Sequence, residues 1–220
     1  MPNFKIIIPC YNSIENIQNI VNALRAKSLL DKVFFIDDGS TDLTSEVLLK
    51  NNCSYHSFKF NKGKGCALRY AFDLFIDDVD FFITMDSDMQ HDVDDLFKMI
   101  ISIESDHLIL GKRDFDTKAM PLDRRLSNKL TTIFLELLLR KKIYDSQCGL
   151  RVYPVNYLKG LFFTTEKFDF ETEVLIKIIR NGCKIKQIPI KTIYGSEISH
   201  IRRIPDIYRF IKLYIRSLLF

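Results

Sequence analysis

The sequence lacks the features that mark membrane-spanning, secreted and low-complexity proteins. No apolar run reaches the roughly 18 residues that cross a bilayer, and the first residues lack the charged, apolar and small-residue order of a signal peptide. Eight glycines and six prolines leave no room for a low-complexity linker, and no segment repeats at a fixed period. We therefore expect the 220 residues to form one substantial globular domain in the cytoplasm.

Cysteine pairs with the spacing of a metal site are also missing. The five cysteines are scattered and odd in number, which favours reduced thiols in a cytoplasmic protein; they are Cys10, Cys53, Cys66, Cys148 and Cys183. Apolar residues make up 47% of the chain and charged residues 27%, so the composition is that of an ordinary folded protein rather than a disordered one.

The positive charge is confined to one end of the chain. Residues 201–220 contain five basic residues and one acid, so this segment carries the whole net charge of +4. A nucleic-acid-binding protein would have a larger basic footprint, and we expect no nucleic-acid partner. The segment predicts a basic amphipathic helix that lies on a membrane surface or, alternatively, docks on the domain. Its apolar face comprises Ile204, Ile207, Ile211, Tyr214, Ile215 and Leu218.

Strand and helix patterns alternate through the first 110 residues. Short apolar runs at 5–8, 33–36, 54–60, 81–85 and 107–110 predict strands, and the segments between them have helical periodicity. Ser13 is placed to cap the first helix, and Thr41 or Asp42 the second. The second half predicts helices at 126–140 and 170–181 and strands at 147–153 and 184–190. This order predicts an α/β fold with a mainly parallel sheet and helices on both faces.

Polar residues follow three of the predicted strands directly. Pro9 to Asn12, Asp37-Asp38 and Asp86-Ser87-Asp88 should meet at one edge, because the carboxyl ends of parallel strands lie together. The oxygens of Asp86, Asp88 and Gln90 suit a Mg²⁺ or Mn²⁺ that also holds phosphates. A solvated acidic loop is the alternative.

Two other sites with paired aspartates do not fit. In a calcium-binding EF-hand loop that starts at Asp86, the sixth residue would be glycine and the twelfth glutamate, but they are His91 and Phe97. In an aspartate-nucleophile phosphatase the pair comes near the start of the fold, with serine or threonine soon after it. Here the pair follows the fourth strand, and Met89-Gln90 comes next.

Several residues have the chemistry to bind a nucleotide. Asp37 and Asp38 can accept hydrogen bonds from a ribose or a base, or can simply form a turn. Gly63 and Gly65 resemble a dinucleotide fingerprint only weakly, although Lys64 can face a phosphate at a helix start. Arg113 and Arg125 can grip phosphate oxygens; surface ion pairs are the alternative.

Taken in order, these motifs resemble a known family. Ile7 to Asn12, Asp37 to Asp42, Gly63 to Gly65 and Met85 to His91 resemble the family 2 glycosyltransferases, which have the GT-A fold. Within that family, the later motifs are similar to the polyprenyl-phosphate sugar transferases of the dolichyl-phosphate mannose synthase type; they are Gly111 to Arg113, Met120 to Lys129, Asp145 to Arg151 and Ile188 to Tyr194. The resemblance covers almost the whole chain.

The resemblance implies a Rossmann-like GT-A domain over residues 1–200, with a nucleotide-binding half at 1–110 and an acceptor half at 111–200, before the C-terminal helix. It implies that a GDP- or UDP-linked sugar is bound by Pro9, Tyr11, Asn12, Asp37, Asp38 and Lys64, and its metal by Asp86, Asp88 and Gln90. Glu15 is a stand-in for a glutamate that the family has where this chain has Ser13, and Lys112 replaces a small residue.

The implied reaction is metal-dependent and inverts the sugar. Arg113 and Arg125 would position a polyprenyl phosphate at the cytoplasmic face of a membrane, and this anionic nucleophile needs no general base. A rival within the family transfers to a sugar hydroxyl of a glycan or glycolipid, with Glu171 or Glu173 as the base. A non-catalytic domain that binds nucleotide-sugars is a further alternative. The residues identify neither the sugar, the base, the lipid nor the oligomeric state.

Overall fold

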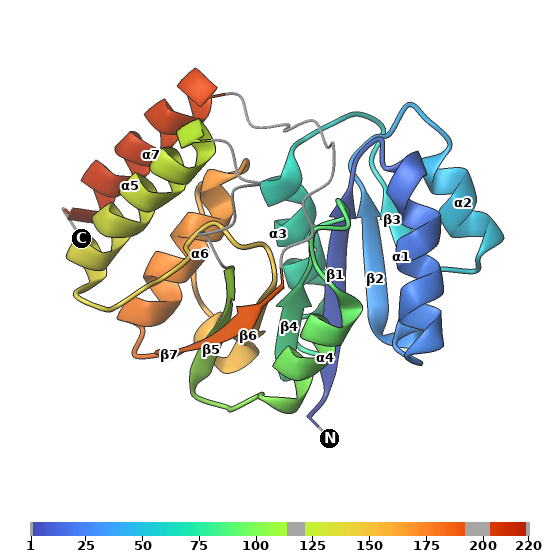
Figure 1. The fold of residues 1–220 in the computed structure, drawn as a ribbon, viewed down its shortest axis with the longest axis horizontal. Helices are drawn as coiled ribbons and strands as arrows, with labels where there is room; N and C mark the ends of the chain where they lie inside the picture. The colour runs from blue at the N-terminus through green and yellow to red at the C-terminus, as the bar shows by residue number, and fades with distance from the viewer. Residues whose placement is uncertain (1, 114–121, 192–202, 219–220) are drawn as a thin grey trace.

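The computed structural model describes residues 2–113, 122–191 and 203–218. These residues form one sheet of seven strands with helices around it (Figure 1). Its strands are β1 (Phe4–Cys10), β2 (Val33–Asp37), β3 (Tyr55–Ser57), β4 (Phe81–Thr84), β5 (His107–Arg113), β6 (Arg151–Pro154) and β7 (Lys184–Ile190). The helices are α1 (Ile14–Ala26), α2 (Thr44–Lys50), α3 (Lys64–Phe75), α4 (Val93–Ile101), α5 (Leu122–Leu139), α6 (Asp169–Arg180) and α7 (Arg203–Leu218), with short 3₁₀ turns at Leu30–Lys32 and Val155–Tyr157.

The sheet is mainly parallel, as the alternating pattern predicts. Its strand order is β3-β2-β1-β4-β6-β5-β7, and only β6 runs antiparallel to its two neighbours. Cys10 pairs with Asp37 and Ile7 with Thr84, so the loops after β1, β2 and β4 leave the sheet at the same edge. That edge is where a ligand of a parallel α/β sheet binds.

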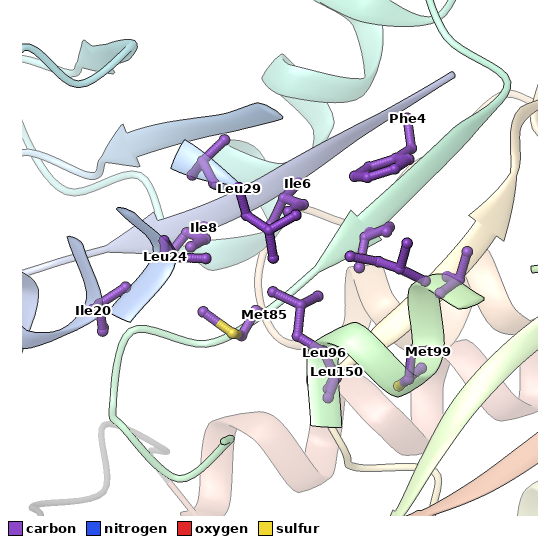
Figure 2. Close-up of a cluster of buried hydrophobic side chains, with 14 of the residues drawn as sticks. Phe4, Ile6, Ile8, Ile20, Leu24, Leu29, Met85, Leu96, Met99 and Leu150 are labelled. Atoms are coloured by element: carbon purple, nitrogen blue, oxygen red, sulfur yellow. The ribbon is translucent and has the colours of Figure 1, made fainter. Parts of the chain in front are cut away.

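Helices cover both faces of the sheet, because alternate residues of each strand point to opposite sides. Ile6 and Ile8 of β1 belong to a buried cluster that includes residues of α1, α2 and α4, whereas Ile7 belongs to a second cluster that includes residues of α3, α5, α6 and α7. Figure 2 shows the first of these two clusters, with Leu96 and Met99 of α4 and Ile6 and Ile8 of β1 labelled. Most of these side chains are fully buried, and this burial supplies the main driving force for folding.

Several element boundaries differ from the prediction. The predicted strand at 54–60 is only Tyr55–Ser57, and the predicted strand at 147–153 begins at Arg151 because residues 145–150 form a loop. The predicted helix at 126–140 begins earlier, at Leu122. The strand at 184–190 and the helix that opens at Lys64 are confirmed.

The start of α1 is capped by a different residue from the one predicted. The Ser13 side chain makes no capping hydrogen bond; its Oγ lies 3.1 Å from Ser87 Oγ instead. Asp42 accepts a hydrogen bond from the backbone N–H of Ile14 at 3.1 Å and another from that of Thr44 at 3.0 Å. Asp42 therefore satisfies amides at the start of α1 as well as the predicted α2.

The C-terminal helix α7 packs against α5 and α6 (Figure 1). Leu213 is buried there, and the Phe134 ring of α5 lies 5.3 Å from the Tyr214 ring. Ile211, Ile215 and Leu218 of the predicted apolar face are exposed, while the side chains of Ile204 and Ile207 lie outside the described residues. Among the described residues, no helix is both long and apolar enough to cross a bilayer.

Candidate active site

Hydrogen bonds tie together the loops that follow β1, β2 and β4. The backbone N–H of Asp38 donates to the carbonyl of Cys10 at 2.8 Å. Asn12 adopts a left-handed conformation with a φ of 48°, and its Oδ1 accepts from the N–H of Thr41 at 2.8 Å. The side chain of Asn12 therefore links the loop after β1 to the loop after β2.

Asp37 and Asp38 also organise backbone. Asp37 accepts from Ser40 N–H at 3.0 Å, which closes the turn after β2. Asp38 accepts from the N–H groups of Lys62 and Gly63, both at 2.7 Å, and so fixes the segment that enters α3. Burial raises the pKa of the Asp38 carboxyl, although these two amides favour its charged form. Because a carboxylate has about four lone-pair sites, each aspartate can still accept from a ligand.

A largely buried lysine lies at the centre of the site. Lys64 Nζ is 2.6 Å from Asp86 Oδ1 and 2.7 Å from Glu171 Oε2, so it joins α3, the β4 loop and α6. Burial acts to lower the pKa of Lys64, but the two carboxylates outweigh it and raise that pKa above its ordinary value. Burial likewise acts to raise the pKa of Asp86, and Lys64 and His91 bring it below its ordinary value. Both partners are thus held charged.

The second oxygen of Asp86 faces Gly149. A Cβ added to Gly149 would fall 2.1 Å from Asp86 Oδ2, so only glycine allows the carboxylate to take this position. The other carboxylate, Glu171, has its Oε1 buried without a hydrogen-bond partner among the described residues. Such an oxygen is costly to leave unpaired, and a ligand donor would relieve that cost.

The residues around Asp86 fit a divalent cation. Asp88, two residues further on, is half-buried, and its Oδ1 accepts from the N–H of Gln90 at 3.0 Å across Met89, whose φ is 59°. Asp86, Asp88 and Gln90 offer hard oxygen ligands, and the ammonium of Lys64 already places a positive charge beside Asp86. A metal ion that binds Asp86 Oδ1 would therefore have to take the place of this ammonium.

His91 follows this loop and is buried. Its Nδ1 has no hydrogen-bond partner among the described residues, and burial lowers the pKa of the imidazole to about 4 even though Asp86 acts to raise it. The ring is therefore neutral at pH 7 and does not contribute a cation to a phosphate site.

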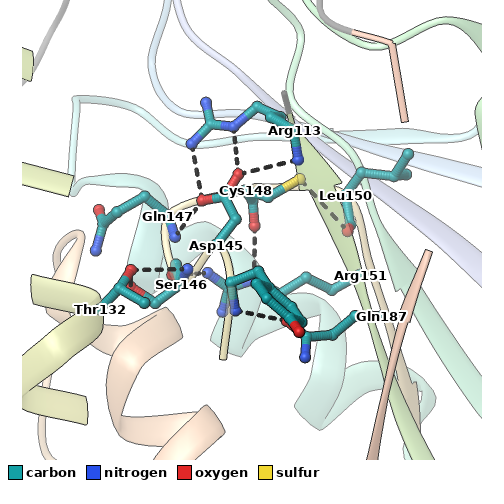
Figure 3. Close-up of polar contacts among 10 residues, drawn as sticks. Arg113, Thr132, Asp145, Ser146, Gln147, Cys148, Leu150, Arg151 and Gln187 are labelled. Atoms are coloured by element: carbon teal, nitrogen blue, oxygen red, sulfur yellow. Dashed lines mark hydrogen bonds and ion pairs between the residues drawn. The ribbon is translucent and has the colours of Figure 1, made fainter. Parts of the chain in front are cut away.

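Arg113 at the end of β5 is held in a two-pronged ion pair (Figure 3). Its Nε is 2.6 Å from Asp145 Oδ2, and its Nη2 donates to Asp145 Oδ1 at 3.1 Å. Both side chains are buried, so the pair fixes the direction of the guanidinium. Arg125 lies in α5, but its side chain is outside the described residues.

Arg151 holds the loop that contains Gly149. Its guanidinium is fully buried and donates to the carbonyls of Cys148 at 2.7 Å and Ser146 at 2.8 Å (Figure 3). It also donates to the carbonyl of Glu171 at 3.0 Å. These bonds position both Gly149 and Glu171. The sequence alone assigns no role to Arg151 or Asp145, because it does not show which arginines and aspartates are buried.

The remaining predicted residues take different places. Pro9 is buried in β1, Tyr11 is half-buried in the loop that follows, and Glu15 is exposed on the first turn of α1. Glu173 is nearly inaccessible, and its two oxygens accept from the N–H and hydroxyl groups of Thr164 and Thr165. Glu173 therefore anchors the segment before α6, and its oxygens are occupied by protein donors.

A further group of possible metal ligands lies at the other edge of the sheet, where β5 begins. It consists of Glu104, Asp106 and His107. Two lysines already pair with it: Lys184 is 2.7 Å from Asp106, and Lys186 is 2.5 Å from Glu104. This surface cluster is separate from the site at the carboxyl edge.

Comparison with known proteins gives consistent results. The family model for Glycosyl transferase family 2 matches residues 5–162. The UDP-N-acetylglucosamine–dolichyl-phosphate N-acetylglucosaminyltransferase of Methanococcus voltae is 32% identical over 217 residues, covering 86% of this chain and 85% of that protein. The undecaprenyl-phosphate mannosyltransferase of Micrococcus luteus is 23% identical over 196 residues, covering 84% of this chain and 81% of that protein.

The solved structures show the fold. Glucosyl-3-phosphoglycerate synthase from Mycobacterium tuberculosis, in complex with Mn²⁺, UDP-glucose and phosphoglyceric acid, superimposes with a TM-score of 0.73. The two proteins are 18% identical, and the match covers 99% of this chain and 79% of that one. This likeness confirms the GT-A fold that the sequence motifs imply.

Glu173→Gln tests whether this carboxylate is structural. Burial acts to raise the pKa of Glu173, but the Lys177 ammonium and the threonine donors outweigh it and lower that pKa from 4.5 to about 2. A carboxyl group whose pKa is lower in the folded protein than in the unfolded chain stabilises the fold at pH values above its ordinary pKa. This stabilisation is lost as the pH falls through the pKa of the folded state. We expect Glu173→Gln to lower the free energy of unfolding by roughly 3 kcal/mol at pH 7.

The difference from wild type should narrow as the pH falls from 4.5 toward 2, as measured by urea unfolding across this range. Glu166→Gln, at an exposed residue of the same segment, serves as the control and should leave stability unchanged. A Glu173→Gln protein that is fully stable but inactive would contradict the structural role.

Proposed function

We propose that this chain, which belongs to glycosyl transferase family 2 and is a glycosyltransferase, transfers a sugar from a GDP- or UDP-linked donor to a polyprenyl phosphate with inversion at the anomeric carbon. The observation that carries the proposal is the Lys64–Asp86 pair at the carboxyl edge of the sheet, where both a diphosphate and its cation would bind. Relatives named for dolichyl-phosphate and undecaprenyl-phosphate acceptors support the acceptor class.

The nucleotide would lie across the first half of the chain, residues 1–110. Pro9, Tyr11 and Asn12 would line the nucleoside pocket, with Glu15 at its margin, and Asp37 and Asp38 would accept hydrogen bonds from the ribose or base. Lys64 would bind the diphosphate.

Asp86, Asp88 and Gln90 would hold Mg²⁺ or Mn²⁺, which when bound supplies Lewis-acid stabilisation of the departing nucleoside diphosphate. The unpartnered Oε1 of Glu171 would accept from a sugar hydroxyl.

The acceptor would enter from the second half, residues 111–200. The ion pair with Asp145 fixes the orientation of the Arg113 guanidinium. Arg113 and Arg125 would position the acceptor phosphate. A phosphate monoester is already an anionic nucleophile at neutral pH, so in-line attack requires no protein base. Glu173, one of the two candidate bases, is fully engaged by protein donors, which agrees with this proposal.

We further propose that α5 and α7 present one surface to a membrane at the cytoplasmic face. The two helices lie side by side (Figure 1), and their outward side chains include several large exposed apolar residues: Leu130, Ile133, Phe134, Leu137, Tyr208, Ile211, Ile215 and Leu218. Exposed basic residues accompany them: Lys129, Arg140, Lys141, Lys142, Lys212 and Arg216. Apolar area with basic residues around it binds anionic lipid surfaces.

Asp88→Ala tests the donor site. In wild type, at least one GDP- or UDP-linked sugar should raise the melting temperature in the presence of Mn²⁺. Asp88→Ala should lose this metal-dependent shift and roughly 100-fold in transfer rate, because a carboxylate ligand of the cation is gone. Asp94→Ala, in the same acidic run but 61% exposed, is the matched control. Failure of every nucleotide-sugar to stabilise the wild-type protein with Mn²⁺ would contradict the proposal.

The acceptor class is tested by chemistry rather than mutation. Transfer should occur to a polyprenyl phosphate and fall below detection with the matching polyprenol, since the alcohol needs a base to become a nucleophile. Formation of the glycosylated lipid is followed by mass spectrometry. Transfer to a free sugar or glycolipid hydroxyl, with none to the phosphate, would instead favour the rival acceptor and Glu171 as its base.

Membrane contact is tested by flotation with vesicles of phosphatidylcholine and phosphatidylglycerol. The double variant Ile211→Ser/Ile215→Ser removes apolar side chains that are 49% and 54% exposed on α7 and should reduce binding by about tenfold or more. The matched variant Leu43→Ser/Leu49→Ser removes side chains of 55% and 64% exposure at α2 and should float as wild type does. Equal loss in both variants would overturn the assignment of this surface.

A further inference from the structure

We propose that Lys64 keeps Asp86 closed to a free divalent cation, so that the cation enters the site only together with a nucleoside diphosphate. This inference rests on the proposed function, in which Asp86 is a metal ligand. Without a ligand, Asp86 already has a cation at hydrogen-bond distance: the Lys64 ammonium, 2.6 Å from Oδ1. A metal ion that binds this oxygen must first displace the ammonium.

Asp86 cannot easily turn to offer its other oxygen. Oδ2 lies so close to Gly149 that a Cβ there would be 2.1 Å away. Gly149 is itself fixed, because the buried Arg151 holds the carbonyl of the preceding residue, Cys148, at 2.7 Å. The Asp86 carboxylate thus lies between the backbone at Gly149 and the ammonium of Lys64.

Lys64 has a second anchor, which lets it pivot rather than leave. Glu171 Oε2 lies 2.7 Å from the ammonium, and the Glu171 backbone is held by Arg151. A free cation would have to separate Lys64 from Asp86 without offering the ammonium a new partner. A nucleoside diphosphate brings anionic oxygens of its own, so Lys64 can exchange Asp86 for a phosphate while it keeps Glu171.

The charges favour this exchange over simple entry of the metal. Only 16% of the Lys64 side chain and 26% of the Asp86 side chain are exposed, so their attraction is weakly screened by water. By linkage, a diphosphate that draws Lys64 away raises the metal affinity by the same factor as the metal raises that of the diphosphate. Lys64 is therefore a positioning residue that couples the two ligands.

The test measures Mn²⁺ binding by the loss of the free-ion electron paramagnetic resonance signal, which does not depend on turnover. Wild type should bind Mn²⁺ alone weakly and far more tightly with UDP or GDP present. Lys64→Gln and Lys64→Met should bind Mn²⁺ alone about tenfold more tightly than wild type, because a competing positive charge is gone. The same variants should bind the nucleotide less tightly.

Two controls assign the effect to this pair. Lys62→Gln removes a neighbouring ammonium, one that lies over the Phe58 ring, and should leave the affinity for Mn²⁺ alone unchanged. Lys64→Gln/Asp86→Asn should lose the gained affinity. Thermal unfolding of each variant shows whether it is folded before Mn²⁺ is added.

Each result either supports or overturns the inference. A folded Lys64→Gln protein that binds Mn²⁺ alone as wild type does would overturn it. So would a wild-type protein whose affinity for Mn²⁺ is the same with and without nucleotide, a measurement that needs no variant to fold. If neither UDP nor GDP binds the wild-type protein, the proposed function fails instead, while the effect of Lys64→Gln on Mn²⁺ alone is still measured.

Discussion

The ammonium of Lys64 holds together three segments that are far apart in the sequence. It comes from the start of α3, and its two carboxylate partners come from the loop after β4 and from α6. Because a buried charge is stable only when it is paired, the three segments must keep this arrangement or pay a large desolvation cost. Arg151 extends the constraint: by bonding the carbonyls of Ser146, Cys148 and Glu171, it fixes the backbone that supports both carboxylate partners.

The acidic residues of the site divide into two kinds. Asp37 and Asp38 accept hydrogen bonds mainly from backbone N–H and hydroxyl groups, so they give the loops their shape. Asp86 is instead paired with a side-chain cation, the Lys64 ammonium. Aspartates therefore both shape the rim and, in the function that we propose, hold the cation, and the partner of each carboxylate distinguishes the two roles.

The sequence predicted the parts of the site that depend on local pattern. Strand ends and the polar residues after them follow from alternation along the chain, and the parallel sheet brings them to one edge. The pairing of Arg113 with Asp145, the close approach of Gly149 to Asp86 and the cap that Asp42 gives α1 join residues at least 28 positions apart. No local pattern encodes such pairs. From the sequence, Glu171 is only a candidate base, since its proximity to Lys64 depends on how α6 packs beside α3.

The protonation of the site bears on the acceptor. A general base works best when its pKa is near the working pH. The pKa of Glu173 lies near 2 because Lys177 and the threonine donors overcome the effect of burial, and that of His91 lies near 4 because of burial. Glu171 accepts from the Lys64 ammonium on one oxygen. Glu173 and His91 are thus poorly suited to remove a proton from a sugar hydroxyl at neutral pH, so a hydroxyl acceptor would depend on Glu171 and its unpartnered Oε1. A phosphate acceptor carries its negative charge with it and makes no such demand, which agrees with the acceptor class that we propose.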